Sequence, residues 1–172
     1  MNPFEQLVTD FQELVGQVPE LVQPFVVMLA SMIPFIEGEG AGPIGVVGGI
    51  HPVVAGIAAA IGNFLAVLGV VTLSSRAREA TIARRLRSGR TSPEPKPESK
   101  GRQRFRRWLV RFGVPGASLI GPLAIPTHFT SAMLVASGTP KRWVLLWQGI
   151  AIVLWTTLTT TLFWVAVSAL VG

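Results

Sequence analysis

The stretch that decides the fold is Pro52–Leu73, PVVAGIAAAIGNFLAVLGVVTL. Asn63 is its only strongly polar side chain, and nearly all of the remaining residues are apolar. As a helix, these 22 residues cover about 33 Å, which matches the hydrocarbon core of one bilayer. We therefore predict a transmembrane helix over residues 52–74.

A strongly basic segment follows this span. Thirteen of the fifteen Lys and Arg residues lie between Arg76 and Arg111, and a Pro-rich run over residues 92–98 lies among them. Basic loops next to spans are retained in the cytoplasm, so we predict a cytoplasmic loop over residues 76–107. The same rule accounts for the net charge of +6, and we expect no binding to nucleic acid.

A second long apolar run lies at the C-terminal side of this loop. Lys141 and Arg142 precede residues 143–171, which as a helix cover about 43 Å and must tilt or protrude. Trp143 and Trp164 are about 31 Å apart along its axis, as suits aromatic residues at two membrane interfaces. We predict a second transmembrane helix that runs from the inside to the outside.

Proline and glycine interrupt two further apolar segments, residues 23–51 and 108–140. Each is too short for two spans and a turn, which need about 40 residues, so each is predicted to be a re-entrant hairpin. The first enters from the outside and the second from the cytoplasm, which implies an inverted repeat and points to a transporter's substrate site. The residues assigned to the hairpin backbones are Gly40, Pro43, Gly45, Pro115, Gly116, Pro122 and Pro126.

The N-terminal residues 3–22 carry apolar side chains at the spacing of one helical face. They predict an amphipathic helix that lies on the membrane surface or on the protein itself. The predicted fold is an all-α integral protein of the inner (plasma) membrane with two inverted repeats, residues 1–75 and 108–172. Each repeat has an amphipathic helix, a re-entrant hairpin and a full transmembrane helix.

The composition argues against several classes of function. Only 14% of residues are charged, against about 25% in a soluble domain, which disfavours a soluble enzyme. The chain has no cysteine, and therefore no disulfide, thiolate nucleophile or Cys-based metal site. Its two histidines cannot form a multi-histidine site alone. We predict no enzymatic activity, no metal and no cofactor.

Glu37 and Glu39 are the strongest candidates for a functional site. A carboxylate inside an apolar segment is costly and suggests a function. Burial favours the neutral form of a carboxyl, which suits proton exchange. We expect both acids on a flexible glycine-rich loop. The alternative is that this loop lies at the outer rim, where both are solvated.

The second hairpin supplies further candidates. The guanidinium of Arg111 is well shaped for a phosphate, and the alternative is an arginine that snorkels at the membrane edge. Ser118, with hydroxyls over residues 127–131, can meet a polar head group or hydrogen-bond within the hairpin. His128 carries an imidazole, which changes its charge near neutral pH. An interfacial position is expected for His51.

Three polar features of the two spans have structural interpretations. Asn63 and Gln148 are the isolated amides of the spans, and we expect them to hydrogen-bond across helices. The cluster Thr156–Thr161 is expected to hydrogen-bond back to the carbonyls of its own helix.

One segment resembles a known family. Pro34-Phe35-Ile36-Glu37-Gly38-Glu39-Gly40-Ala41-Gly42-Pro43-Ile44-Gly45 is similar to the signature of the small multi-drug export proteins, roughly Pro-Phe-x-Glu-Leu-Arg-Gly-Ala-Ile-Pro-Leu-Gly. Ala124-Ile125-Pro126 resembles the second apolar-Pro motif of that family. Two departures are that Glu39 stands where the family has Arg, and that Thr127-His128 replace a Pro-Gly.

That family is similar in turn to the DedA superfamily, whose members have opposed re-entrant hairpins. Arg111-Phe112 followed by Pro115-Gly116 resembles its Arg-Phe-x-Pro-Gly pattern with one extra residue, and Ala117-Ser118 stand where that pattern has a second arginine. Some DedA members resemble proton-motive-force-dependent carriers of polyprenyl-phosphate lipids. The resemblance therefore implies transport of such a lipid, with membrane lipid and protons as partners.

The predicted function is that of a membrane transporter or flippase-like carrier of an amphipathic substrate. The first candidate for this substrate is a polyprenyl phosphate. Glu37 or Glu39 would couple protons, while Arg111 and the hairpin backbone would hold the head group. One alternative is efflux of small cationic drugs, bound by Glu37 and Glu39. Another is a membrane scaffold or assembly subunit. Two spans and two hairpins are too few segments to cover the hairpins on all sides. A homodimer or a membrane partner protein is therefore expected.

Overall fold

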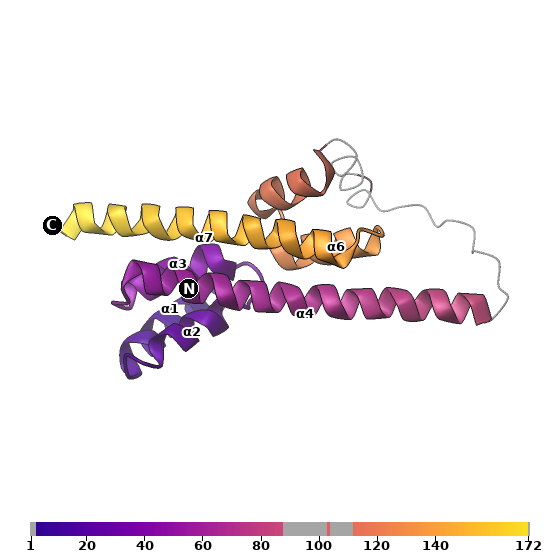
Figure 1. Cartoon of the computed structure of the whole chain (residues 1–172). Coiled ribbons are helices and arrows are strands. Elements are labelled where there is room, and N and C mark those ends of the chain that lie inside the picture. Colours follow the sequence, from indigo (N-terminus) through magenta and orange to yellow (C-terminus); the bar gives the residue numbers. More distant parts are fainter. Residues whose placement is uncertain (1–2, 88–102, 104–111, 172) are drawn as a thin grey trace. The chain divides into compact units, whose positions relative to one another are not determined.

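The computed structural model is built of helices and describes residues 3–87, 103 and 112–171 (Figure 1). No strand occurs in these residues, so the prediction of an all-α chain is confirmed. The chain divides into two compact units. The first unit comprises residues 1–66 and 149–172, and the second comprises residues 67–148.

Two long helices contribute to both units. Helix α4 (Pro52–Arg87) and helix α7 (Lys141–Val171) are long and apolar enough to cross a membrane. Helix α4 continues well past residue 74, the predicted end of the first span, because residues 75–87 contain no Gly or Pro and are rich in Arg, Ala and Leu. The start of the predicted basic loop is therefore helical. Residues 88–102 and 104–107 of that loop lie outside the described residues.

The first unit begins with three shorter helices, α1 (Pro3–Gln17), α2 (Gln23–Ser31) and α3 (Glu37–Val47), which pack on one another. Helix α1 ends at Gln17 rather than at residue 22, because Pro19 disfavours a helical Val18. Val15 of α1 is fully buried, and a Cβ at Gly48 would collide with it. Of the two expected locations for this helix, the structure shows the one on the protein itself.

Helix α3 lies unusually close to α7 within the first unit. A Cβ added at Gly38 would collide with Oγ1 of Thr156, and one at Gly42 would collide with Oγ1 of Thr160. The two glycines are four residues apart on α3, and the two threonines are four residues apart on α7. One face of α3 that carries glycines therefore packs on one face of α7 that carries threonines. Gly45 allows a third close contact, since its Cβ would lie 2.9 Å from Cβ of Ala55. Glycines at such spacing let helices approach closely.

The second unit contains a helix over residues 112–120, the 3₁₀ turn η1 (Gly121–Leu123) and helix α6 (Thr127–Ala136). Thr130 of α6 packs on η1, where a Cβ at Gly121 would lie 3.3 Å from its Cγ2. The C-terminal part of α4 reaches the turn between α6 and α7. There Glu79 Oε1 lies 3.5 Å from Lys141 Nζ, and both side chains are exposed.

Helices α3 and α6 end in the same way. Gly49 (φ +88°) and Gly138 (φ +98°) adopt the left-handed conformation that glycine favours. The next residue then donates back five positions, from Ile50 N–H to Gly45 O at 3.0 Å and from Thr139 N–H to Leu134 O at 3.1 Å. These are Schellman caps; Pro52 then begins α4, and Pro140 immediately precedes α7. Each unit therefore contains a short helix, a turn, a second short helix, a glycine cap and the start of a long helix.

The Gly42 contact generates a stability prediction. Gly42→Ala places a methyl group against Oγ1 of Thr160 and should lower the free energy of unfolding by about 1–3 kcal/mol. Gly69→Ala is the matched control, because a Cβ there meets nothing within 4 Å, and it should stabilise α4 by about 0.5–1 kcal/mol. Thermal unfolding followed by circular dichroism measures both changes. Equal effects of the two substitutions would contradict the close contact.

Candidate functional site

The two carboxylates of the first hairpin are placed by helix α3. The expectation of a flexible loop is wrong, because Glu37 and Glu39 form the first turn of this helix. Its glycines face packed neighbours, and helical hydrogen bonds such as Gly40 N–H to Ile36 O at 2.8 Å are made. Glu37 is 5% exposed, and both carboxylate oxygens of Glu39 are shielded from solvent. The first turn of a helix is a favourable place for carboxylates.

The turn that precedes α3 has a strained backbone. Phe35 (φ +76°) and Glu37 (φ +48°) both have positive φ angles, which cost an L-residue about 1–2 kcal/mol. Ile36 between them is buried, and the N–H of Glu37 donates to Ile33 O at 3.0 Å. The turn thus brings the Glu37 side chain into the core while Phe35 stays exposed. Such strain is concentrated at functional sites.

Two buried hydroxyls of α7 lie against this carboxylate-bearing segment. Thr156 Oγ1 contacts Gly38, which stands between the two glutamates, and Thr160 Oγ1 contacts Gly42. Neither hydroxyl has a hydrogen-bond partner within the described part of the chain. The expectation of bonds to the helix's own carbonyls is confirmed for Thr159, which donates to Trp155 O at 3.0 Å. Sequence reasoning missed the role of Thr156 and Thr160 because it depends on the glycine spacing of a different helix.

The second hairpin buries a polar face of its own. Thr127, His128, Thr130 and Ser131 are all buried in the first turns of α6, and Ser118 on the preceding helix is fully buried. The hydroxyls of Ser118, Thr130 and Ser131 have no partner among the described residues. Helix α6 follows Pro126 and has no side-chain cap, so its N-terminal N–H groups add positive potential to this polar face.

Gln148 extends the same pattern in the second unit. It is fully buried, and neither its amide oxygen nor its amide nitrogen has a partner among the described residues. The expected hydrogen bond across helices is therefore not found for Gln148. A buried polar group without a partner costs about 1–3 kcal/mol. The second unit thus buries several polar groups that have no hydrogen-bond partner among the described residues.

The prolines and glycines assigned to the hairpin backbones have structural positions in the two units. Pro43 lies inside α3, Pro122 is in η1, and Pro126 adopts an extended conformation (ψ 144°) immediately before α6. A Cβ at Gly116 would collide with the side chain of Phe112, so this glycine serves packing. The remaining hairpin residues are Gly40, whose Cβ would lie 3.3 Å from the side chain of Ile36 at the N-cap of α3, and the half-buried Pro115. Arg111 lies outside the described residues.

The two units carry opposite charges. All fifteen Lys and Arg residues lie in the second unit, whereas six of the nine Asp and Glu residues lie in the first. The first unit therefore presents two glutamates in its hairpin without a cation of its own. The second unit contains the buried hydroxyls and His128 together with every Lys and Arg of the chain.

No family model, no curated protein and no solved structure matches the chain. The resemblance to the small multi-drug export proteins accordingly depends on the motifs at residues 34–45 and 112–136. Among the described residues, no group of three His, Asp or Glu side chains is arranged to hold a metal ion.

The strained turn generates a prediction about its own conformation. Phe35→Gly should relieve the positive φ and raise the free energy of unfolding by about 1 kcal/mol. Phe25→Gly is the matched control, because this similarly exposed phenylalanine lies inside helix α2, where glycine costs about 0.5–1 kcal/mol. Chemical denaturation of both variants measures the difference. A loss of stability in Phe35→Gly as large as that in Phe25→Gly would argue against a strained turn.

Proposed function

We propose that the chain is a multi-pass carrier of the inner membrane that moves an amphipathic lipid phosphate, with polyprenyl phosphate as the leading substrate. It would be a relative of the small multi-drug export proteins. The observation that carries this proposal is the buried polar face of α6, where the hydroxyls of Thr130 and Ser131 have no partner among the described residues, inside a unit that holds every Lys and Arg of the chain. Hydroxyls, backbone N–H groups and basic residues together suit a phosphate head group.

A membrane setting is supported by how little of the long helices the chain itself covers. In the most apolar window of each, only 33% of α4 and 22% of α7 is buried. Leu154, Leu158 and Leu162 are among the large side chains that α7 leaves exposed. A core helix of a soluble protein would be mostly covered, whereas lipid can cover such a surface.

The proposed topology follows from charge. The basic end of α4 meets the start of α7 through Glu79 and Lys141, and basic segments stay in the cytoplasm. The second hairpin then begins and ends inside and the first begins and ends outside. The shared order of elements in the two units supports an inverted repeat.

Proton coupling is assigned to the first hairpin. Glu37 is held in the core by a strained turn, and Glu39 is shielded from solvent. A carboxyl that alternates between a buried and a hydrated environment can take up and release a proton. The carrier would thus hold the head group in one hairpin and exchange the proton in the other.

A transport assay tests the proposal. The purified chain in phosphatidylcholine vesicles should carry a fluorescent prenyl phosphate between leaflets, which an impermeant quencher detects. Ser131→Ala should slow this transport about tenfold or more, since a hydrogen bond to a charged group contributes about 1.5–3 kcal/mol. Ser137→Ala is the matched control, because Ser137 is exposed and donates to Leu134 O at 2.7 Å. Equal rates in both variants, or a rate no faster than in empty vesicles, would contradict the proposal.

The charge of the first unit favours one alternative, the efflux of small cationic drugs. Six acidic residues and no Lys or Arg lie in this unit, and Glu37 and Glu39 would bind the cation directly. The same vesicles distinguish the two functions. Glu39→Gln should abolish transport of a cationic dye if the alternative holds, whereas Arg111→Ala should abolish transport of the prenyl phosphate if the lipid carrier holds.

A further inference from the structure

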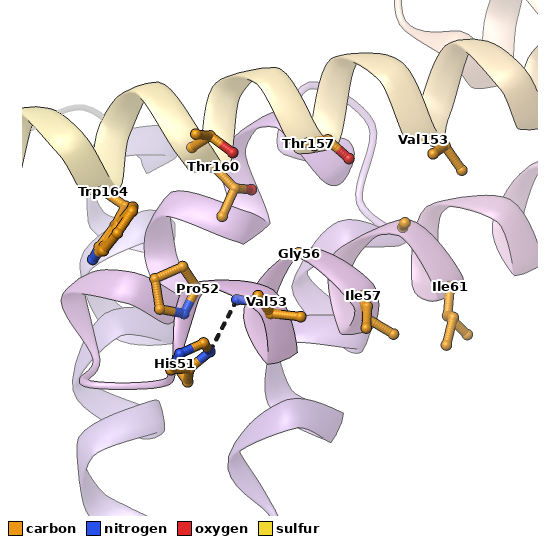
Figure 2. Close-up of a pocket in the computed structure, with 12 residues that line it drawn as sticks. His51, Pro52, Val53, Gly56, Ile57, Ile61, Val153, Thr157, Thr160 and Trp164 are labelled. Carbon is orange, nitrogen blue, oxygen red and sulfur yellow. Dashed lines mark hydrogen bonds between the residues drawn. The ribbon is translucent and has the colours of Figure 1, made fainter.

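The first unit contains a cavity whose lining includes neither Glu37 nor Glu39. It has a volume of about 510 Å³ and lies between the first turns of α4 and the C-terminal part of α7 (Figure 2). This volume lies within the range of small-molecule sites. Its walls are mostly aliphatic, with a histidine, a tryptophan and three threonines of α7 among them.

The cavity has a polar end and an apolar end. His51, Pro52 and Trp164 lie at one end, and Ile61 and Val153 lie at the other (Figure 2). The N–H of Val53 donates to Nδ1 of His51 at 3.3 Å, so the neutral ring carries its proton on Nε2 and can donate from there. The indole N–H of Trp164 is a second donor. The polar end therefore suits a head group that accepts hydrogen bonds.

The length of the cavity matches one leaflet of a bilayer. His51 and Ile61 are ten residues apart along the chain, or about 15 Å along the helix, which is half of the roughly 30 Å hydrocarbon core. Tryptophan is enriched at the membrane interface, which is where Trp164 would lie in the proposed topology. A hydrocarbon chain that starts at this end would reach the middle of the bilayer near Ile61.

The charges around the cavity select the head group. The lining contains no Asp, Glu, Lys or Arg, and the first unit has no Lys or Arg to pair with an anion. A charged head group would find no counter-ion among the lining residues, and any part of it that enters the apolar cavity would be desolvated at a cost. A polar but uncharged head group avoids that cost and still accepts from His51 and Trp164.

Thr160 lies in the wall of the cavity, but its hydroxyl is shielded from solvent and packs against Gly42 of α3. The donors that a head group can reach are therefore those of His51 and Trp164. We propose that the cavity binds an uncharged single-chain amphiphile, such as a monoacylglycerol or a long-chain alcohol. Its head group lies at His51 and Trp164, and its chain runs between α4 and α7. This inference rests on the membrane setting proposed above but not on transport.

Photo-crosslinking tests this site in phosphatidylcholine vesicles that contain the full chain. The probe is a monoacylglycerol with a diazirine in its acyl chain, and mass spectrometry locates the label. We expect label on residues 52–61 and 153–164. Unlabelled monoacylglycerol should compete, whereas the fatty acid and the amine of the same chain length should compete at least fivefold less well. Label spread evenly along both long helices, or equal competition by a charged chain, would overturn the proposal.

A matched pair of variants separates the cavity from general contact with lipid. A Cβ at Gly56 lies 3.8 Å from Thr160, an ordinary contact, so Gly56→Leu can extend into the cavity. It should reduce the label at least fivefold, whereas Gly69→Leu on the same helix, where a Cβ meets nothing within 4 Å, should leave it unchanged. Equal labelling of the two variants would overturn the proposal. Flotation of the vesicles is the independent readout. A chain that does not float with them overturns the membrane setting as well, whereas a floating chain without selective label overturns this inference alone.

Discussion

The close contact between the glycines of α3 and the threonines of α7 is the constraint on which the rest of the first unit depends. Gly38 and Gly42 leave room for the hydroxyls of Thr156 and Thr160. This contact holds a glycine-rich segment in a helix, although glycine is a poor helix former. Because α3 is held there, the strained turn before it places Glu37 in the core and shields the carboxylate oxygens of Glu39. A bulkier residue at Gly38 or Gly42 would separate the helices and disturb both acids.

The two units bury different kinds of polar group. This difference supports the proposal that the first unit exchanges the proton and the second binds the head group. In the first unit, two carboxylates occupy the first turn of α3, and this unit contains no Lys or Arg. In the second, buried hydroxyls and a histidine lie in the first turns of α6, and Gln148 is a buried amide of α7. In the second unit, the hydroxyls of Ser118, Thr130 and Ser131 and the amide of Gln148 have no hydrogen-bond partner among the described residues, which is costly for buried groups. The proposal that a polar head group binds in this unit accounts for that cost.

Periodicity and composition predicted the long helices and the two interrupted segments, because these depend on local properties such as hydropathy and the placement of proline. They also directed attention to Glu37, Glu39, Ser118 and His128. They did not predict that residues 37–47 form a helix. High glycine content indicates a loop unless the surface on which the segment packs, here the threonine face of α7, is known. The threonine partners on α7 are more than 110 residues away in the chain, and no local pattern relates them to Gly38. The sequence also does not predict the left-handed conformation of Phe35, because phenylalanine does not favour a positive φ.

The most direct test of the account asks on which side of the membrane each hairpin begins and ends. The chain has no cysteine, so single cysteines can be introduced at Gln17, before the first hairpin, and at Ser137, after the second, both exposed. An impermeant maleimide applied to intact cells should label Gln17→Cys, and should label Ser137→Cys only after the membrane is permeabilised. Labelling of both positions from the same side would contradict opposed hairpins, and with them the carrier proposed for this chain.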